Sequence, residues 1–391
     1  MASPIRILTA VPICDGHDSA INTINLEFIR HGIEVVYLGY HRSVGDIARA
    51  AIQEDVRAIG ISSYNGGHIE FFADVVKQLR KQGAADIKVF GGGGGTITHT
   101  DAKAMESKGV EKIFFAGTSL DEMSDYVREN YGKPRKKRSP SRTRDIELAR
   151  KLTEIEDAYA NGKRPTPNAR KHQTSNLKHH TSRVIGFTGP GGAGKTTLID
   201  ELVLRFLSHK PKARIAILSH DPSVVGEGAL LGDRAMMINS QHDRVFMRSM
   251  ATRGQAGGLS PATEGCLREL IGAGFDYVII ETVGTGQEAM PFQENGIVDM
   301  TVLVMNPDYG ARLQLQKIVM LDLADIVVVN KTDQTRARAA ILEIEQRLEQ
   351  NRRSQQLVAS VAKRHRDPGV DELFGLISGN GAKPAKRRRK K

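Results

Sequence analysis

Tryptophan is absent from the 391-residue sequence, and cysteine occurs only at positions 14 and 266. Two cysteines cannot form the disulfide framework of a small secreted protein, so we expect a reducing, cytoplasmic environment. The sequence also lacks an apolar run of the roughly 18 residues that a membrane-spanning helix requires. Met1 to Arg6 lead directly into an apolar segment, so we expect neither a signal peptide nor a membrane partner.

Acidic residues are scarce in two segments. Residues 133–183 contain 15 lysines and arginines against 5 aspartates and glutamates, and residues 383–391 contain 7 basic residues and no acidic one. Because the whole chain carries a formal net charge of +11, the rest of it is mildly acidic. A nucleic-acid contact would depend on these two segments alone. The basic run has no interleaved aromatic residues, so we favour a solubilising hinge over nuclear targeting or RNA binding.

Residues 1–132 alternate short apolar strands with helical patterns. Five such pairs predict an α/β domain with a doubly wound, flavodoxin-like parallel sheet. Ligands of these sheets bind outside the carboxyl ends of the strands. The loops after the first, third and fourth strands are therefore the candidate site. The five predicted strands are 5–11, 34–38, 58–62, 87–90 and 113–115.

Those three loops have unusual sequences. The first contains Asp15-Gly16-His17, the second begins Ser62-Ser63-Tyr64, and the third is a run of five glycines from Gly91 to Gly95. Five consecutive glycines lose much chain entropy on ordering, so we expect another group to approach this backbone closely. Taken alone, an Asp-x-His triplet is more often a capping aspartate beside a solvated histidine. A receiver domain would also place an aspartate after its first strand.

Together, the loops resemble the cobalamin-binding domain of the coenzyme-B12-dependent acyl-CoA mutases. That family's pattern is D-x-H-x-x-G, then S-x-L about forty residues later, then G-G. Ala20 and Tyr64 depart from it, and the fused isobutyryl-CoA mutases share both departures.

The resemblance implies a role for each matching residue. His17 would be the lower axial ligand of cobalt in adenosylcobalamin, and Asp15 would orient its imidazole. Ser62 would bind the displaced nucleotide tail of the cofactor, and Gly91 and Gly92 would leave room for that tail.

A polar boundary follows this domain. Lys133 to Arg144 combine low hydrophobicity with high charge, which predicts disorder. Apolar residues then recur at helical spacing between residues 145 and 159, which predicts an amphipathic helix that docks on the next domain. Residues 161–181 return to a polar linker.

Residues 189–197 read Gly-Pro-Gly-Gly-Ala-Gly-Lys-Thr-Thr and match the phosphate-binding pattern G-x-x-x-x-G-K-[ST]. An apolar strand at 183–188 precedes the loop and an amphipathic helix follows it, as this motif requires. Backbone N–H groups and the helix N-terminus would bind phosphate oxygens, Lys195 would contact the β- and γ-phosphates, and the Thr196 hydroxyl would bind Mg²⁺. The predicted nucleotide-binding residues here are Gly191, Gly192, Ala193, Gly194, Lys195, Thr196 and Thr197.

Carboxylates follow the neighbouring strands. Asp221 comes after the strand 213–220, Asp233 lies twelve residues further on, and Glu281 ends the strand at 277–280. Such residues beside a phosphate-binding loop are placed to hold Mg²⁺ and its waters, although either aspartate alone could be a helix N-cap. We predict Thr196, Asp221, Asp233 and Glu281 as magnesium ligands, and Lys195, Thr196 and Glu281 as catalytic residues.

The motif Asn330-Lys331-Thr332-Asp333 is N-K-x-D and follows an apolar strand about 135 residues after the phosphate-binding loop. Asp333 would accept hydrogen bonds from guanine N1 and N2, which adenine cannot donate, so GTP is expected over ATP. Asn330 and Lys331 complete the predicted base site. Residues 360–363 are a weaker candidate for the last base-side loop.

These motifs look like the G-protein chaperones of B12-dependent mutases. The spacing from Asp221 to Asp233 is one residue shorter than that family's, and Glu227-Gly228 replaces its Gly-Gly. Arg248 and Arg253 could reach the phosphates or relay a switch, although exposed arginines are more often only solvated.

The resemblance implies a cobalamin-binding domain at 1–132, a basic linker with a helix at 133–182, a P-loop G-protein domain at 183–380 and a basic tail at 381–391. The order matches the first part of the fused isobutyryl-CoA mutases, but the acyl-CoA-binding barrel of that family is missing. We therefore expect either a separate large subunit or a truncated gene.

The implied function is a GTP-hydrolysing chaperone and cobalamin-binding component of an adenosylcobalamin-dependent acyl-CoA mutase, of isobutyryl-CoA or methylmalonyl-CoA type, working as a homodimer. The alternatives are a GTP-dependent cobalamin chaperone or sensor without an isomerase partner, and a GTPase that binds nucleic acid through the basic segments.

Overall fold

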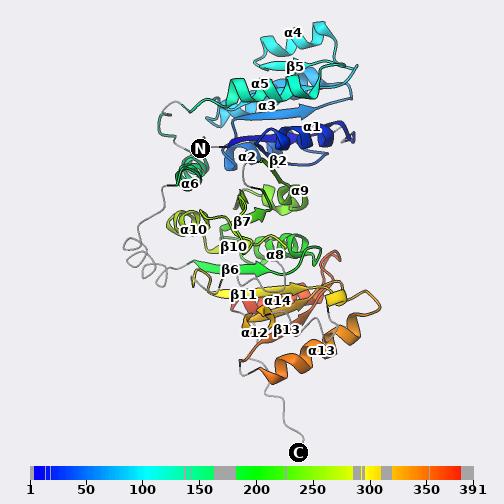
Figure 1. The fold of residues 1–391 in the computed structure, drawn as a ribbon, viewed down its shortest axis with the longest axis vertical. Coiled ribbons are helices and arrows are strands. Elements are labelled where there is room, and N and C mark those ends of the chain that lie inside the picture. The colour runs from blue at the N-terminus through cyan, green and yellow to red at the C-terminus, as the bar shows by residue number, and fades with distance from the viewer. Residues whose placement is uncertain are drawn as a thin grey trace, which may run out of the picture. The chain divides into compact units, whose positions relative to one another are not determined.

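The computed structural model describes residues 4–13, 15–17, 19–135, 138–141, 143–162, 182–224, 227–284, 292, 296–309, 319–351 and 353–379. The chain separates into two compact units. Their helices and strands are drawn and labelled in Figure 1. The first comprises Met1–Arg183 and Ile215–Val278, and the second comprises Val184–Arg214 and Ile279–Lys391. In the part of the chain that is described, no helix is long and apolar enough to cross a membrane.

A six-stranded sheet organises the first unit, with strand order β5-β4-β3-β1-β2-β8. The five strands predicted from the sequence are confirmed, and β1 lies between β2 and β3 as in a doubly wound sheet. The sixth strand was not predicted, since no secondary structure was assigned to its residues from the sequence. The strands are β1 (Ile5–Ala10), β2 (Ile33–Tyr37), β3 (Ala58–Ser62), β4 (Lys88–Gly92), β5 (Lys112–Phe114) and β8 (Ala229–Leu231).

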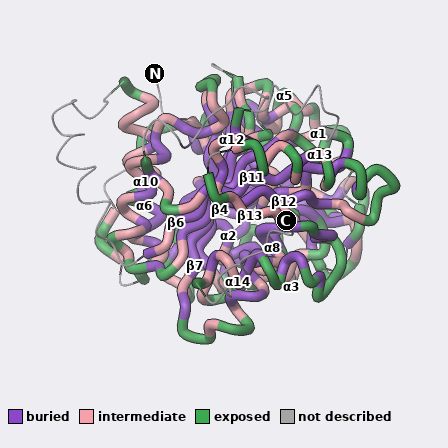
Figure 2. The backbone as a smooth tube through the Cα atoms, turned by 90° about the horizontal axis from the view of Figure 1, so that it is seen from below, coloured by how far each residue is buried: buried purple, intermediate pink, exposed green. Residues whose placement is uncertain are grey.

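Helices cover both faces of this sheet, because successive strand residues point to opposite sides. Leu8 packs with α2 and α3 on one face, whereas its neighbour Ile7 packs with α1 and α5 on the other. Figure 2 shows the strands as the buried part of the chain. The helices are α1 (Ser19–Arg30), α2 (Val44–Gln53), α3 (His68–Lys81), α4 (His99–Ser107), α5 (Leu120–Tyr131) and α6 (Arg144–Ala160).

The rest of the first unit follows β7 (Ile215–Asp221), which pairs in parallel with β9 (Val245–Ala251). The predicted amphipathic helix is confirmed as α6, which packs within the first unit against both α2 and α10 (Thr263–Gly272). The short helices α9 (Asp233–Met236) and η1 (Ile238–Gln241) lie between β8 and β9. Strand β10 (Tyr277–Glu281) crosses the boundary between the two units.

Among the described residues of the second unit, parallel pairing joins four strands in the order β13-β12-β11-β6. The phosphate-binding loop follows β6 and the N-K-x-D motif follows β12, so both lie at carboxyl ends of strands, as predicted. The elements are β6 (Arg183–Thr188), α8 (Lys195–His209), β11 (Met300–Met305), η2 (Pro307–Tyr309), α12 (Met320–Leu323), β12 (Ile326–Val329), α13 (Ala337–Gln350), β13 (Gln356–Ala359) and α14 (Pro368–Ser378).

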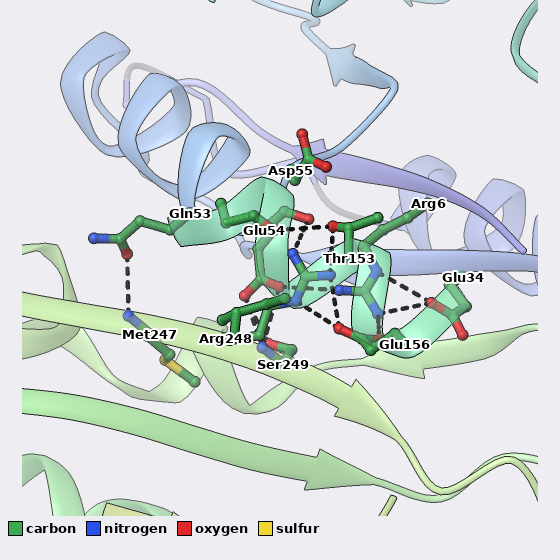
Figure 3. Close-up of polar contacts among 12 residues, drawn as sticks. Arg6, Glu34, Gln53, Glu54, Asp55, Thr153, Glu156, Met247, Arg248 and Ser249 are labelled. Carbon is green, nitrogen blue, oxygen red and sulfur yellow. Dashed lines mark hydrogen bonds and ion pairs between the residues drawn. The ribbon is translucent and has the colours of Figure 1, made fainter. Parts of the chain in front are cut away.

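A buried network of ion pairs joins distant segments of the first unit (Figure 3). The Arg6 guanidinium donates to Glu34 at 2.9 Å and to Glu156 at 2.7 Å, and Arg248 donates to the other oxygen of Glu156 at 2.9 Å. Arg253 pairs with Glu34 at 3.0 Å. Burial would raise the pKa of Glu156, but the charges of Arg248 and Arg6 outweigh it and hold that pKa below its usual range. Arg248 is only 1% exposed, so the interpretation of this arginine as a solvated surface residue is wrong.

A second part of the network surrounds Glu54, which follows the last residue of α2. Its carboxylate accepts hydrogen bonds from Arg234 at 3.0 Å and from the backbone and hydroxyl of Ser249 at 3.0 and 2.9 Å. Both Glu54 and Arg234 are fully buried. The neighbouring Gln53 binds Arg234 as well, so the end of α2 holds α9 and β9 together.

Part of the basic boundary is also ordered, which differs from the predicted disorder. Arg138 pairs with Asp55 at 2.6 Å, and Arg135 contacts the same carboxylate. Burial alone would raise the pKa of Asp55, but the two guanidinium groups lower it to about 2. These residues are therefore attached to the domain and do not form a solvated hinge; residues 136, 137, 142 and 163–181 lie outside the described part of the chain.

We predict that Glu156→Gln destabilises the first unit by about 3–5 kcal/mol, because it leaves buried guanidinium groups without a counter-charge. Hydrogen exchange of peptides covering β1 and β9 measures this, with exposed Glu154→Gln as the control. Since the pKa of Glu156 is lowered on folding, its contribution is present above its ordinary value of 4.5 and is lost as pH falls through the folded value. The wild type should therefore lose more stability between pH 5 and pH 3 than the variant, and equal losses would contradict this assignment.

Candidate functional site

Asp15 is the residue on which the first candidate site is built. It is fully buried in the loop after β1, and its Oδ1 atom lies 2.7 Å from His17 Nδ1. Its other oxygen accepts hydrogen bonds from the backbone N–H groups of Tyr64 and Asn65 in the loop after β3. Burial would raise the pKa of Asp15, but these hydrogen bonds outweigh it and lower the pKa, so the group is a carboxylate at neutral pH.

His17 is held by this carboxylate and still faces solvent. Its side chain is 68% exposed, and its ring lies 5.6 Å from that of Tyr64. Because an ionised carboxylate only accepts hydrogen bonds, Nδ1 carries the proton of this contact, and Nε2 is the ring nitrogen that stays available to a ligand. This is the arrangement that a metal-binding histidine requires.

A cavity of about 340 Å³ lies over the carboxyl ends of β1, β3 and β4. Ser62, Gly91 and Gly92, which the sequence predicted as tail-binding residues, all line it. Thr9 also lines it and was not predicted, because it lies inside a strand and matches no motif. Its buried Oγ1 has no hydrogen-bond partner among the described residues, so the cavity offers a polar atom for a ligand.

The glycine run is explained first by the packing of the sheet. A Cβ atom at Gly91 would lie 2.2 Å from the carbonyl oxygen of Ile61, and one at Gly93 would lie 2.0 Å from that of Ser63. A Cβ atom at Gly95 would meet nothing within 4 Å. The close approach expected from the sequence is therefore made by the neighbouring strand and its loop. Sheet packing alone already requires glycine at these positions, and Gly91 and Gly93 also line the cavity.

The phosphate-binding loop of the second unit has the backbone expected of it. Gly189, Gly192 and Gly194 have φ values of 139°, 73° and 89°, which favour glycine. Lys195 is only 7% exposed, and its ammonium group donates to the carbonyls of Gly189 at 3.1 Å and Pro190 at 3.3 Å. The Lys195 side chain thus lies against the phosphate-binding loop, where its charge is predicted to contact the phosphates.

Two of the four predicted magnesium ligands meet in the second unit. The Thr196 hydroxyl donates to Glu281 Oε1 at 2.7 Å, which places two oxygen donors of the kind Mg²⁺ prefers side by side. Asp221 ends β7 and Asp233 begins α9, both in the first unit, and Ser219 hydrogen-bonds to Asp233. The oxygen atoms of Thr196 and Glu281 are of the kind that suits the ion, and the assignment of all four residues as magnesium ligands stays a prediction.

The predicted base site is assembled around Asn330. Its amide donates to the carbonyl of Ala193 at 2.9 Å and accepts from the backbone N–H of Ala362 at 2.9 Å, which ties three loops together. A cavity of about 290 Å³ adjoins these loops and is lined by Thr197, Lys331 and Asp333. Lys363 pairs with Asp333 at 2.6 Å and lowers its pKa. Residues 360–363, the weaker sequence candidate, thus belong to this site.

The fold and these sites define a P-loop G protein joined to a flavodoxin-like ligand-binding domain. Residues 148–383 match the family described as Methylmalonyl Co-A mutase-associated GTPase MeaB, and residues 5–122 match the B12 binding domain. The chain belongs to the MeaB GTPase family and also carries a B12-binding domain.

Comparison with curated relatives confirms the predicted resemblance. The chain is 38% identical over 395 residues to the fused isobutyryl-CoA mutase of Geobacillus kaustophilus, which covers 95% of this chain and 36% of that protein. It is 37% identical over 406 residues to the fused isobutyryl-CoA mutase of Cupriavidus metallidurans, covering 98% of this chain and 36% of that protein. The chain therefore spans about a third of the length of these relatives. Among solved structures, the hydrogenase maturation factor HypB of Archaeoglobus fulgidus is 17% identical and covers 54% of this chain and 96% of its own, with a TM-score of 0.39.

Two glycines of the same run should respond differently to substitution. We predict that Gly91→Ala lowers the thermal unfolding midpoint by many degrees, because its Cβ atom cannot coexist with the carbonyl oxygen of Ile61. Gly95→Ala should change the midpoint by no more than a few degrees, since it meets open space. Equal effects in circular-dichroism melts would show that packing of the sheet is not what requires Gly91.

Proposed function

We propose that this chain hydrolyses GTP and holds adenosylcobalamin for an acyl-CoA mutase, acting as its G-protein chaperone and its cobalamin-binding component. The observation that carries the proposal is the Asp15–His17 pair, in which Asp15 Oδ1 lies 2.7 Å from Nδ1 of a histidine side chain that is 68% exposed. The His17 ring lies 5.6 Å from that of Tyr64, which lines the cavity over the strand ends. Membership of the MeaB family and the presence of a B12-binding domain support it.

On the cobalamin side, His17 would ligate cobalt through Nε2 while Asp15 holds the imidazole in the required tautomer. Ser62 and Thr9 would offer hydroxyl groups to the nucleotide tail, over the bare backbone of Gly91 and Gly92. When bound, adenosylcobalamin would supply the radical chemistry of the mutase, and this chain's residues would orient and protect the cofactor.

On the nucleotide side, the N–H groups of residues 191–194 and the Lys195 ammonium would stabilise charge on the phosphates. Thr196 and Glu281 would hold Mg²⁺, with Asp221 and Asp233 as further ligands. Asp333 would accept from the guanine N1 and N2 groups and so select GTP.

We propose isomerase activity only for an assembly in which a separate large subunit supplies the acyl-CoA-binding barrel. Isobutyryl-CoA and methylmalonyl-CoA are the substrate types that the relatives and the matched family suggest. We further propose that the chain forms a homodimer and works in the cytoplasm, with the GTP state controlling loading of the cofactor.

The cobalt ligand can be tested by titrating the purified chain with adenosylcobalamin and recording visible spectra. The wild type should bind saturably and shift to the spectrum of the benzimidazole-displaced cofactor, and His17→Ala should lose that shift. His365→Ala is a suitable control, because the His365 side chain is 73% exposed, similar to that of His17, and lies in the second unit. Unchanged spectra in His17→Ala would remove His17 as the ligand, and an absence of binding by the wild type would overturn the cobalamin half of the proposal.

Base selection can be tested with Asp333→Asn, which replaces a hydrogen-bond acceptor by a donor. We expect its Kd for GTP to rise by about 100-fold or more, while xanthosine triphosphate, which has an oxygen in place of the 2-amino group, binds better than to the wild type. Asp308→Asn, at an exposed aspartate of the same unit, should leave both affinities unchanged. Equal affinity of the wild type for GTP and ATP would contradict the assigned role of Asp333.

A further inference from the structure

A cavity of about 750 Å³ lies at the amino ends of β1, β2 and β3, where Arg6, Glu34 and Arg57 line it. All of its lining residues belong to the first unit. It shares none of them with the cavity over the carboxyl ends of β1, β3 and β4, or with the cavity beside Asp333. Ligands of parallel α/β sheets usually bind at the carboxyl ends of the strands, so the fold alone does not account for this cavity.

Charged side chains dominate the lining of this cavity. Eight basic and six acidic residues face it. Ligand pockets of roughly 300–1,000 Å³ are usually lined for the most part by apolar side chains, so the composition of this one is unusual. The surplus of basic residues favours a ligand that carries negative charge.

Most of these arginines already have carboxylate partners. Arg6 and Arg248 both pair with Glu156 at 2.7 Å (Figure 3). Arg138 donates to both oxygens of Asp55, at 2.6 and 3.1 Å. Such pairs neutralise the arginines within the fold, so an anionic ligand depends on the basic residues that lack a close carboxylate.

Arg57 is a half-buried arginine of this second kind. In the part of the chain that the structure describes, no carboxylate lies within ion-pair distance of it, and Nη1 donates to the carbonyl of Lys133 at 2.9 Å. That contact uses one of the five N–H donors of a guanidinium group. Burial and the charge of nearby Arg135 lower the pKa of Arg57 to about 10, and the charges of Asp157 and Asp55 do not offset them. An anion at this position would supply the missing counter-charge.

Arg150 of α6 is a second arginine with donors to spare. Its side chain is only 12% exposed, and Nη1 donates to the carbonyl of Ser139 at 2.8 Å. Its contact with Glu147 is long, at 3.5 Å. Nε is buried and has no hydrogen-bond partner among the described residues. Because a buried donor without an acceptor is costly, an acceptor on a ligand would stabilise this arginine.

The two arginines favour a phosphate group over a carboxylate. Arg57 precedes β3 and Arg150 lies in α6, so they come to the cavity from two different elements. A phosphate group carries more charge and more acceptor oxygens than a carboxylate, and can accept from two guanidinium groups at once. The cavity is far larger than a phosphate ion, which indicates a phosphate attached to a larger molecule.

We propose that this cavity binds a phosphate-bearing small molecule, with Arg57 and Arg150 as the residues that bind the phosphate. The site is formed by the first unit alone, so it does not depend on the proposed cobalamin and GTP sites. Both arginines also donate to the carbonyls of Lys133 and Ser139. Binding would therefore tie the segment after α5 more firmly to β3 and α6.

The test uses inorganic pyrophosphate as the probe and isothermal titration calorimetry of the full chain, which is first saturated with GDP to occupy the phosphate-binding loop. The wild type should bind saturably. Arg57→Met and Arg150→Met should each raise the Kd by roughly 10-fold or more, because each removes charge-assisted hydrogen bonds to the phosphate. Arg57→Lys, which keeps the charge, should recover part of the affinity.

Arg128→Met is the matched control, because Arg128 lies exposed on α5, pairs with Asp125 and does not line the cavity. It should keep the Kd of the wild type. Three results would overturn the proposal: no binding by the wild type, a Kd that neither Arg57→Met nor Arg150→Met changes, or equally tight binding of succinate, which would make the site one for carboxylates.

Thermal unfolding without pyrophosphate separates a binding role of Arg57 from a structural one. Arg57→Met should melt at or above the temperature of the wild type, because it removes a partly buried charge that has no close carboxylate. Arg138→Met should melt lower, because it leaves Asp55 without its bidentate partner. An equal loss in both variants would show that Arg57 serves the fold and would contradict its assignment to a ligand.

Hydrogen exchange of the wild type gives a result that does not depend on any variant. Pyrophosphate added to the GDP-saturated chain should raise protection in peptides covering residues 130–135 and 147–153. Protection confined to residues 189–197 would place the probe in the phosphate-binding loop and overturn the proposal, while leaving the proposed function intact.

Discussion

The ion pairs of Glu156 are the constraint on which the first unit depends. One carboxylate lies between Arg6 of β1 and Arg248 of β9, so helix α6 is bound to two strands that lie more than 200 residues apart in the chain. A buried charge without its partner costs several kcal/mol, whereas a complete set of partners adds little net stability. The network therefore adds little to the stability of the unit, but it disfavours any arrangement of the segments in which one of these charges loses its partner (Figure 3).

This constraint brings a segment with G-protein motifs onto the sheet of a cobalamin-binding domain. The buried contacts of Glu54 fix α9, and the pairing of β8 with β2 extends the sheet by one strand. In isolation, the edge of β2 would present unpaired backbone groups, which natural sheets usually cover. Here the segment before Asp233 covers this edge, so the same contact completes the sheet and fixes the position of a residue that the sequence predicts as a magnesium ligand.

The two candidate sites share a way of being held in place. Asp15 ties the loop after β1 to the loop after β3 through backbone N–H groups, and Asn330 ties the phosphate-binding loop to the base-side loops through its amide. In each case one buried polar side chain satisfies backbone groups of separate loops. The side chains of Asp15 and Asn330 thereby hold the loops in place. His17 and Asp333 lie at the surface, each at its own candidate site.

The sequence by itself determined the five strands of the first sheet and the phosphate-binding loop, whereas the pairing of Asp15 with His17 was implied by the resemblance to the B12-dependent mutases. These features depend on residues close together in the chain, where glycine conformation, apolar periodicity and short motifs determine the local backbone structure. It also pointed to the strand ends that carry Ser62 and Gly91, because parallel strands place their carboxyl ends together. Motifs of this length are recognisable because few residue types satisfy their local geometry.

Only the tertiary structure decided what β8, Arg248 and the basic residues at 135 and 138 do. The sequence of residues 229–231 is too short for a periodic signal, and its partner strand lies almost 200 residues earlier. Arg248 and Arg138 have the composition of surface residues, and they are buried or docked because Glu156 and Asp55 are brought to them by the fold. A charge is placed by the position of its counter-charge, and that position depends on contacts between segments that no local pattern records.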